Sequence, residues 1–370
     1  MSWPLVKLTE VAEVNPRCPK DIDEDQIVSF VAMASASEAG LLLGEELRVL
    51  KDTKKGFTYF ERGDVLLAKI TPCFENGKTL RPYQIKNQVG FGSTEFHVVR
   101  ADLEKLDPTY LFYLLWSDAF RFLGTNAMAG AAGQKRVGTP FLKQLEIPLP
   151  PLDEQKRIAA ILDKADAIRQ KRKQAIDLAD EFLRSVFLDM FGDPVTNPKG
   201  WEVTTCGETF KLSSGKGLTA KNMDKDGNYL VYGGNGINGK HSEYMFEEPQ
   251  LIIGRVGVYC GSIHITEKKS WVTDNAMYIK EYLKKVNIIF LAQLLDLANL
   301  NQYAGKAAQP LISGNRIYPL EIIFPPIEEQ ERFAKIHKVF IESMAKLHGG
   351  LESKSDLFQS LSQKAFSGQL

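Results

Sequence analysis

Basic side chains follow strand-like apolar runs at two places in the sequence. Lys69 follows the run 65–68, Arg255 follows the run 251–254, and a turn-rich segment comes after each. Lys and Arg contact phosphate oxygens and the O6/N7 edge of guanine. A basic residue at the same place in two parts of the chain therefore predicts two sites for a polyanion. The alternative interpretation is a pair of solvated surface charges.

A second polar cluster is Gln134-Lys135-Arg136, which glycines flank on both sides. Gln309 stands at the corresponding place in the second half of the chain, where a proline and a leucine replace the basic pair. The two glutamines are therefore the stronger candidates for a function that the halves share.

The glycine-rich segment 234–239 matches the GxGxxG pattern of dinucleotide-binding folds. That pattern must open a helix, but Pro249 arrives before such a helix can form. Residues 234–240 also match GxxxxGK, but His241 stands where a P-loop needs Ser or Thr. A mobile glycine hairpin is one interpretation, and a loop that follows a phosphate backbone is the other. The candidate side chains in it are Asn235, Asn238 and Lys240.

Signatures of catalysis and metal binding are missing from the sequence. There is no GxSxG, and the two Pro-Pro pairs follow Leu149 and Phe324 rather than the Asn or Asp of amino-methyltransferases. The four cysteines form no CxxC pair, and the five histidines never fall at HExxH spacing. We expect a protein that is not an enzyme, without metal or cofactor. An enzyme whose site is invisible in the sequence is the least favoured alternative.

Length and composition indicate a folded protein of two or three domains. The chain has 370 residues, of which 44% are hydrophobic and 25% charged. Its 46 Lys and Arg balance 46 Asp and Glu, so no overall field attracts a polyanion, although a local basic face would suffice. No apolar run is long enough for a membrane span, and the N-terminus lacks the pattern of a signal peptide. We expect a cytoplasmic protein that does not contact membranes.

The chain contains an internal repeat. Residues 150–161 align without a gap on residues 325–336, an offset of 175, and seven of the twelve positions are identical. Leu145-Glu146-Ile147 meets Leu320-Glu321-Ile322 at the same offset. The halves also begin alike at an offset of 198, where Trp3 and Glu10 correspond to Trp201 and Glu208.

Helical periodicity follows each Pro-Pro pair. The first copy predicts one helix of about 40 residues, roughly 60 Å long. Its expected apolar seam is Ile158, Ile161, Ala165, Ile168, Ala175, Ala179, Phe182 and Val186. The second copy carries Gly349-Gly350, which predicts a bend or break there.

Each long helix must bury its apolar stripe, and the repeat partner is the other such helix in the chain. Antiparallel pairing is expected, with helices from different chains as the alternative. Strand-like runs at 65–68, 96–99, 251–253 and 277–279, with one helix each at 108–122 and 286–300, predict α+β globular units related by a pseudo-two-fold repeat.

The duplicated Pro-Pro-Leu/Ile-Asp/Glu-Glu-Gln helix starts, the Trp-opening halves and Gly-Arg-Val-Gly-Val-Tyr-Cys-Gly at 254–261 together resemble the specificity subunits of type I restriction-modification systems. The resemblance implies two target-recognition domains separated by an antiparallel coiled coil. It also implies a bipartite double-stranded DNA target, two methyltransferase subunits seated on the helices, and restriction subunits in the full complex. A coiled-coil scaffold with two protein-binding domains is the alternative.

The boundaries expected from this organisation are recognition domains at 1–149 and 199–324, helical spacers at 150–191 and 325–370, and a linker at 192–198. The candidate DNA contacts are Lys69, Thr71, Lys78, Gln134, Lys135, Arg136, Asn235, Asn238, Lys240, Arg255, Asn275, Gln309 and Arg316. The candidate subunit-interface residues are Glu154, Gln155, Arg157, Glu329, Gln330 and Arg332.

Overall fold

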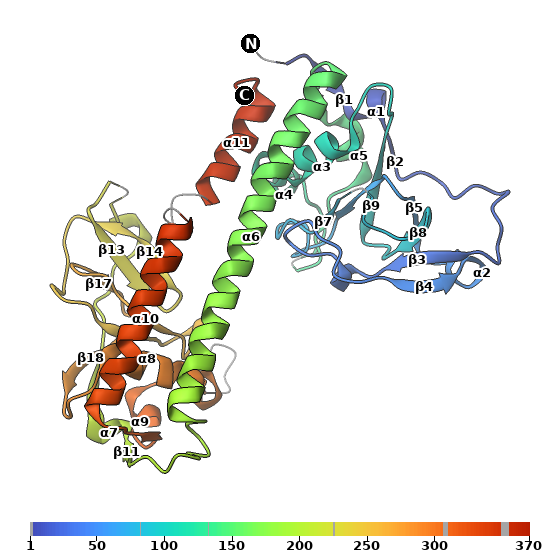
Figure 1. The fold of residues 1–370 in the computed structure, drawn as a ribbon. Coiled ribbons are helices and arrows are strands. Elements are labelled where there is room, and N and C mark those ends of the chain that lie inside the picture. The colour runs from blue at the N-terminus through green and yellow to red at the C-terminus, as the bar shows by residue number, and fades with distance from the viewer. Residues whose placement is uncertain (1–2, 82, 132, 225, 306–309, 349–354) are drawn as a thin grey trace. The chain divides into compact units, whose positions relative to one another are not determined.

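The computed structural model of the chain describes residues 3–81, 83–131, 133–224, 226–305, 310–348 and 355–370 (Figure 1). The chain divides into two compact units. Unit 1 is Met1–Lys173 with Gly350–Leu370, and unit 2 is Gln174–Gly349. No helix among the described residues is long and apolar enough to cross a membrane.

Unit 1 contains two four-stranded sheets, in the strand orders β2-β9-β6-β7 and β4-β3-β8-β5. Their bounds are β2 Ala12–Val14, β3 Ile27–Val31, β4 Glu46–Val49, β5 Thr58–Glu61, β6 Val65–Ala68, β7 Thr79–Leu80, β8 Val89–Gly92 and β9 Phe96–Ala101. β6 lies between β9 and β7 and occupies the strand-like run expected at 65–68, and all four of its residues are buried. A short 3-10 helix at Met33–Ser35 follows β3, and helix α2, Leu50–Thr53, follows β4.

Unit 2 repeats the first sheet with four strands, and its second sheet has three strands instead of four. Its sheets have the orders β12-β18-β15-β16 and β14-β13-β17. Their bounds are β12 Phe210–Ser214, β13 Tyr229–Gly233, β14 Gly236–His241, β15 Leu251–Gly254, β16 Ile263–Ile265, β17 Trp271–Val272 and β18 Ala276–Tyr282. In each unit one parallel pair lies in the second sheet, β3 with β8 and β13 with β17. Short 3-10 helices lie at Ala220–Asn222, Gly257–Tyr259 and Leu300–Tyr303.

A two-stranded sheet closes each unit next to its long helix. β1, Leu5–Lys7, pairs with β10, Glu146–Pro148, and β11, Val203–Thr205, pairs with β19, Glu321–Ile323. Val6 lies opposite Ile147, and Thr204 lies opposite Ile322, so both sequence offsets, 198 and 175, recur in the strand register. Helices α1, Leu8–Val11, and α7, Cys206–Thr209, follow β1 and β11 at equivalent places. The duplication predicted from the sequence is thus confirmed in the fold.

Each first sheet packs against a buried helix. α3, Pro108–Trp116, begins after Asp107, whose carboxylate accepts hydrogen bonds from the backbone N–H groups of Thr109 and Tyr110. α8, Ile288–Leu297, begins in the same way after Asn287. The remaining helices of the globular parts are α4 Asp118–Asn126, α5 Thr139–Gln144 and α9 Gly314–Ile317. The α+β fold class expected from the sequence is confirmed.

The single helix expected at 108–122 is wrong. Ser117 has an extended ψ of 151°, which ends α3, and its hydroxyl accepts from the backbone N–H of Phe120, which starts α4. A serine that can cap a helix therefore separates two nine-residue helices.

The long helix α6, Leu152–Phe191, has the 40 residues that the periodicity predicted. In unit 1 its first part runs antiparallel to α11, Ser355–Ser367: Arg157 donates to the Leu370 carbonyl at 3.0 Å, and Arg169 lies 5.9 Å from the ring of Phe358. In unit 2 its last part runs antiparallel to α10, Ile327–His348, where Phe182 lies 4.5 Å from Phe340. The antiparallel pairing expected within one chain is confirmed in both units.

The apolar seam predicted for α6 is partly wrong. Ile168 and Phe182 are 51% and 45% exposed, whereas Leu162 and Phe187 are completely buried. The globular parts select which face of the helix is covered, and the periodicity alone does not encode that choice. The break expected at Gly349-Gly350 falls outside the described residues, between the end of α10 and the start of α11.

Candidate nucleic-acid interface

The segment after β6 pairs with the segment 135–137 in unit 1. Thr71 N–H donates to the Lys135 carbonyl at 3.0 Å, and Val137 N–H donates to the Lys69 carbonyl at 2.9 Å, with a β-bridge between Ile70 and Arg136. Lys69 N–H donates in turn to the carbonyl of Glu95 at 2.9 Å. Two polar segments that lie far apart in the sequence, 69–71 and 134–136, are therefore adjacent.

Unit 2 repeats these bonds after β15. Arg255 N–H donates to the Asn275 carbonyl at 2.9 Å, and Ile312 N–H donates to the Arg255 carbonyl at 3.0 Å. A β-bridge joins Val256 to Leu311, as Ile70 joins Arg136 in unit 1. Lys69 and Arg255 therefore hold equivalent backbone positions, which confirms the place that the sequence assigned to the pair; their contact with DNA stays a prediction.

The side chains at this place in unit 1 form an ion pair. Arg136 donates from Nη2 and Nε to the carboxylate of Glu95 at 2.9 and 3.0 Å, and from Nη1 to the Gln134 carbonyl at 3.1 Å. The hydrogen bond from Arg136 lowers the pKa of Glu95, and the charge of Lys69 acts in the same direction. Burial lowers the pKa of the adjacent His97, whose Nε2 lies 2.8 Å from the Val137 carbonyl. His97 is therefore neutral at pH 7.

Unit 2 presents a different set of side chains. Arg255 Nη1 donates to the hydroxyl of Ser214, at the end of β12, at 2.8 Å. Gly234 follows β13, and a Cβ there would lie 3.1 Å from the Asn275 carbonyl and 3.4 Å from the Cα of Gly254. This close approach brings the turn that carries Asn235 to the same edge as Arg255 and Asn275. The glycine motif at 234–239 is therefore part of a β-hairpin, with the turn at 234–235 and the first residues of β14, rather than a phosphate loop that opens a helix.

The structure also places the other predicted contacts. Lys240 lies on β14 and pairs with Leu230 of β13. It is four residues beyond Gly236, about 13 Å along the strand. Arg316, on α9, donates to the Tyr303 carbonyl at 3.0 Å. Asn238 lies on β14. Thr71 belongs to the segment 69–71 itself, and its half-buried hydroxyl donates to Glu75. The carbonyl of Lys78 accepts from the backbone N–H of Ala68, the residue before Lys69. Gln309 lies outside the described residues.

Sequence reasoning missed Glu95 and Ser214. Both lie at strand ends whose neighbours are set by the pairing of β9 with β6 and of β12 with β18, and no local motif marks either residue. The equivalence of Glu95 and Asn275 becomes visible only when the two backbone arrangements are aligned.

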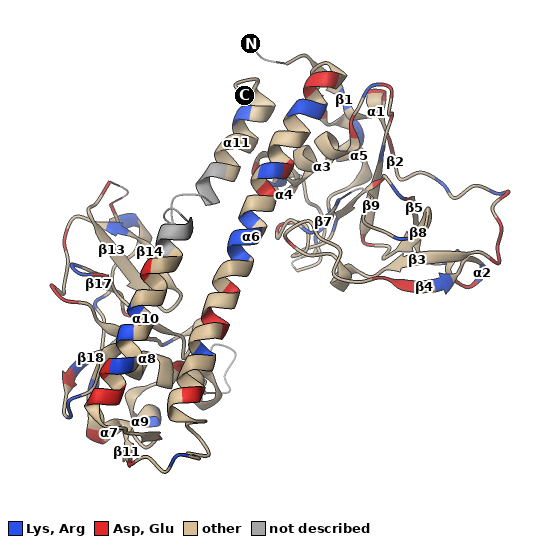
Figure 2. Cartoon of the chain, in the orientation of Figure 1, with Lys and Arg blue, Asp and Glu red and all other residues tan. Residues whose placement is uncertain are grey.

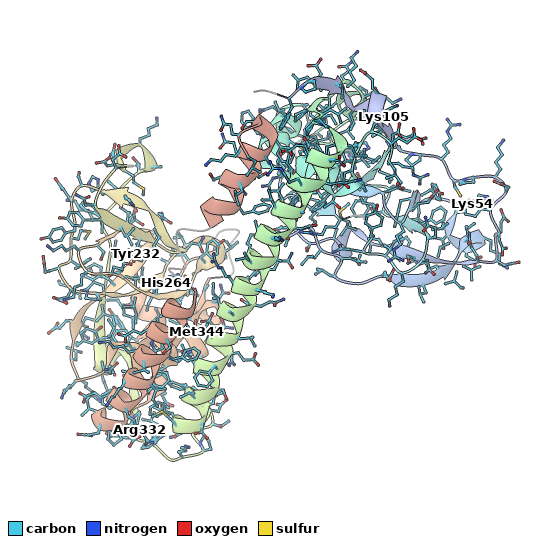
Figure 3. All side chains as sticks on the ribbon, turned by 45° about the horizontal axis from the view of Figure 1, so that its top comes forward. Lys54, Lys105, Tyr232, His264, Arg332 and Met344 are labelled. Atoms are coloured by element: carbon cyan, nitrogen blue, oxygen red, sulfur yellow. The ribbon has the colours of Figure 1, made fainter. Side chains whose placement is uncertain are left out.

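The structure corrects the subunit-interface role that was predicted for two residues, Gln155 and Gln330. Gln155 and Gln330 are completely buried. Each accepts a 2.9 Å hydrogen bond from the backbone N–H of a helix-capping residue, Asp107 or Asn287, and donates to the carbonyl of the first proline of its Pro-Pro pair at 2.8 Å. They connect each long helix to its globular part and offer no surface to a partner. Interface roles stay predictions for Glu154, Arg157, Glu329 and Arg332, the last of which is labelled in Figure 3.

Replacing Gln330 by Ala is expected to destabilise unit 2 by about 2–4 kcal/mol, because it leaves the Asn287 N–H and the Pro325 carbonyl buried without their partner. A urea unfolding curve, monitored by a spectroscopic probe in unit 2, measures the change in the free energy of unfolding. Lys335→Ala, an exposed substitution on the same helix, should stay within about 0.5 kcal/mol. Equal unfolding curves for the two variants would contradict the structural role of the glutamine.

Charges of both signs are spread over each unit, and acidic and basic bands alternate along α6 (Figure 2). Figure 3 labels Tyr232 on β13 and His264 on β16, the latter beside the hairpin turn, where a Cβ at Gly236 would lie 3.5 Å from its ring. Among the described residues no group of three or more His, Cys, Asp or Glu could hold a metal ion. A polyanion would therefore meet local basic groups at the strand ends rather than a uniformly positive surface.

The fold and the site define a duplicated α+β protein. Each copy carries a basic residue at one strand end, and a buried glutamine of the long helix that bonds to the globular part. The chain belongs to the family described as the type I restriction modification DNA specificity domain, which matches residues 2–178 and again residues 198–354. This match confirms the resemblance inferred from the duplicated motifs.

Curated relatives include the EcoAI specificity subunit of Escherichia coli, 36% identical over 189 residues that cover 50% of this chain and 32% of that protein. The match therefore spans about a third of that relative's length. The EcoprrI specificity subunit of Escherichia coli is 27% identical over 325 residues, covering 84% of this chain and 79% of the relative.

Two solved structures share the fold. The type I restriction-modification S subunit from M. genitalium has a TM-score of 0.58 and 16% identity, covering 99% of this chain and 96% of that one. A chain from a study of assembly and conformational transition of the type I system has a TM-score of 0.51 and 21% identity, covering 100% and 98%.

Proposed function

We propose that this chain is the sequence-specific DNA-binding subunit of a type I restriction-modification complex, in which each unit binds one part of a split target. The observation that carries the proposal is the repeated backbone arrangement that places Lys69 and Arg255 at equivalent strand ends. Two similar units with different side chains at this place suit a target made of two different half-sites.

The proposed domain boundaries are those expected from the sequence, with recognition domains at 1–149 and 199–324, helical spacers at 150–191 and 325–370, and a linker at 192–198. The exposed parts of the helices would seat two methyltransferase subunits, with restriction subunits joining the full complex. Exposed apolar side chains on these helices, such as Leu178 at 64% and Val339 at 56%, support a protein partner there. Catalysis would belong to those partners, and this chain would be non-catalytic.

Lys69→Ala and Arg255→Ala are each expected to weaken binding to double-stranded DNA. If the side chains contact phosphate, binding falls evenly across sequences and the salt slope drops by about 0.9 per contact. If they contact guanine, about 1–3 kcal/mol is lost at one base pair. Mobility shifts with a pool of genomic fragments, with and without the methyltransferase subunits, measure both.

Lys51→Ala is the matched control, because Lys51 is an exposed lysine of unit 1 that pairs with Asp25 on another surface segment. Unchanged DNA binding by both the Lys69 and the Arg255 variants would refute the paired site. A wild-type chain that binds no DNA with or without methyltransferase subunits would favour the scaffold alternative.

A further inference from the structure

The guanidinium of Arg136 is fixed by its neighbours in unit 1. A guanidinium has five N–H groups. Glu95 takes one from Nε and one from Nη2, and the Gln134 carbonyl takes one from Nη1. One N–H on each terminal nitrogen is left over, and the side chain is 43% exposed.

A carboxylate on a surface that binds a polyanion needs a reason, because it repels phosphate. The Glu95 side chain is 26% exposed and accepts from Arg136 with both oxygens. Such a bidentate arrangement fixes the orientation of a guanidinium. Without it, an exposed arginine on its flexible stem would have no single orientation. The two remaining N–H groups match the two acceptors, O6 and N7, that a guanine presents in the major groove.

Unit 2 lacks both members of this pair at the equivalent backbone positions. Asn275 stands in the place of Glu95, because its carbonyl accepts from Arg255 as that of Glu95 accepts from Lys69. Leu311, which is 44% exposed, stands in the place of Arg136. The acid and the base are replaced together. Arg255, which holds the backbone position of Lys69, donates from its guanidinium to the Ser214 hydroxyl instead.

We propose that Glu95 is a positioning residue that orients Arg136 toward a guanine in the half-site bound by unit 1, and that residues 95 and 136 set the base preference of that half-site. This inference rests on the proposed function. In unit 2 the same positions carry an amide, which suits adenine, and an exposed leucine, which suits the methyl group of thymine. The two half-sites therefore differ in base composition where these positions meet the groove.

The experiment compares Glu95→Gln, Arg136→Ala and Arg136→Lys in the complex with its methyltransferase subunits. Binding is measured on duplexes in which each base pair of the wild-type target is replaced in turn. All three variants should reduce the preference for one G·C pair in one half-site by about 5- to 150-fold, the range of one bidentate base contact. Arg136→Lys is decisive, because it keeps the positive charge but loses the planar fork. Preferences in the other half-site should stay as in the wild type.

Asp25→Asn is the matched control, because it removes the acid of another exposed ion pair of unit 1, Lys51–Asp25 at 2.8 Å, and should leave every base preference unchanged. Thermal unfolding of all variants separates misfolding from lost recognition. If the Glu95 and Arg136 variants weaken all duplexes equally, or if Arg136→Lys keeps the full preference, Arg136 contacts phosphate and the inference is overturned. A wild-type complex without any base preference would instead overturn the proposed function.

Discussion

Deletion of residues 355–370 is expected to unfold unit 1 under conditions in which unit 2 stays folded. These residues include α11, which belongs to unit 1 although it lies at the other end of the sequence. Phe358 and Ala365 are buried in the main core of the unit, with Leu361 and Phe366 packed against it. The Phe358 ring lies 5.6 Å from Trp116, and the Phe366 ring lies 5.4 Å from Tyr110.

The expected size of this effect follows from the buried rings. Truncation of one buried Phe to Ala typically costs about 3–5 kcal/mol, so the loss of the whole helix approaches the stability of an ordinary domain. The deletion also removes the Ala365 carbonyl that accepts from the indole of Trp3 at 3.2 Å. Native-state hydrogen exchange, resolved by segment, should show fast exchange throughout the strands of unit 1 and protected strands in unit 2.

Two single substitutions, one in each unit, test the same assignment as the deletion. Phe358→Ala should destabilise unit 1 alone by about 3–5 kcal/mol. Phe182→Ala, on a ring that is 45% exposed in unit 2, should cost much less and should not affect unit 1. Unchanged protection of β6 and β9 in the truncated chain would contradict the assignment of α11 to the core of unit 1.

The sequence predicted the repeat, the long helix and the strand-like runs because each is encoded by local periodicity or by matching segments. The 175 offset recurs in the pairing of Gln155 and Gln330 with equivalent caps. The sequence did not predict which face of α6 is covered. Leu162 is buried and Ile168 is exposed because the packing partners come from distant parts of the chain.

The candidate site shows the same division. Lys69 and Arg255 could be paired from the sequence, because each follows an apolar strand. Glu95 could not, since its contact with Arg136 spans 41 residues and depends on the register of β6 with β9. Gln155 and Gln330 were recognised as repeated, but their role was misinterpreted. A buried side chain that bonds to the start of a neighbouring helix and a side chain that contacts a partner both give a repeated glutamine in the sequence.

Exchange of residues 1–144 for the matching segment of another member of the family is expected to change one half of the DNA target and to leave the other half intact. One reason is that part of the link between the long helix and the globular part is made by backbone groups of the exchanged segment. The side chain of Gln155 bonds to the Asp107 N–H and to the Lys105 carbonyl, and β10 pairs with the backbone of β1. These bonds do not depend on the identity of the exchanged side chains.

The donor segment must keep aromatic residues at the positions of Tyr110 and Tyr113, because these rings pack against Phe366 and Phe358 of α11. It must also keep an arginine at the position of Arg81, which pairs with Asp163 and the buried Asp166 of α6. With these conditions met, sequencing of the methylated sites in cells that carry the chimaera and its methyltransferase subunits should reveal one new half-site and one old one. The reciprocal exchange of residues 199–319 should alter the opposite half, which makes the two chimaeras controls for each other. If either exchange altered both half-sites, the units would not bind DNA independently. The equivalent positions of Lys69 and Arg255 would then reflect shared ancestry of the fold rather than two separate recognition sites.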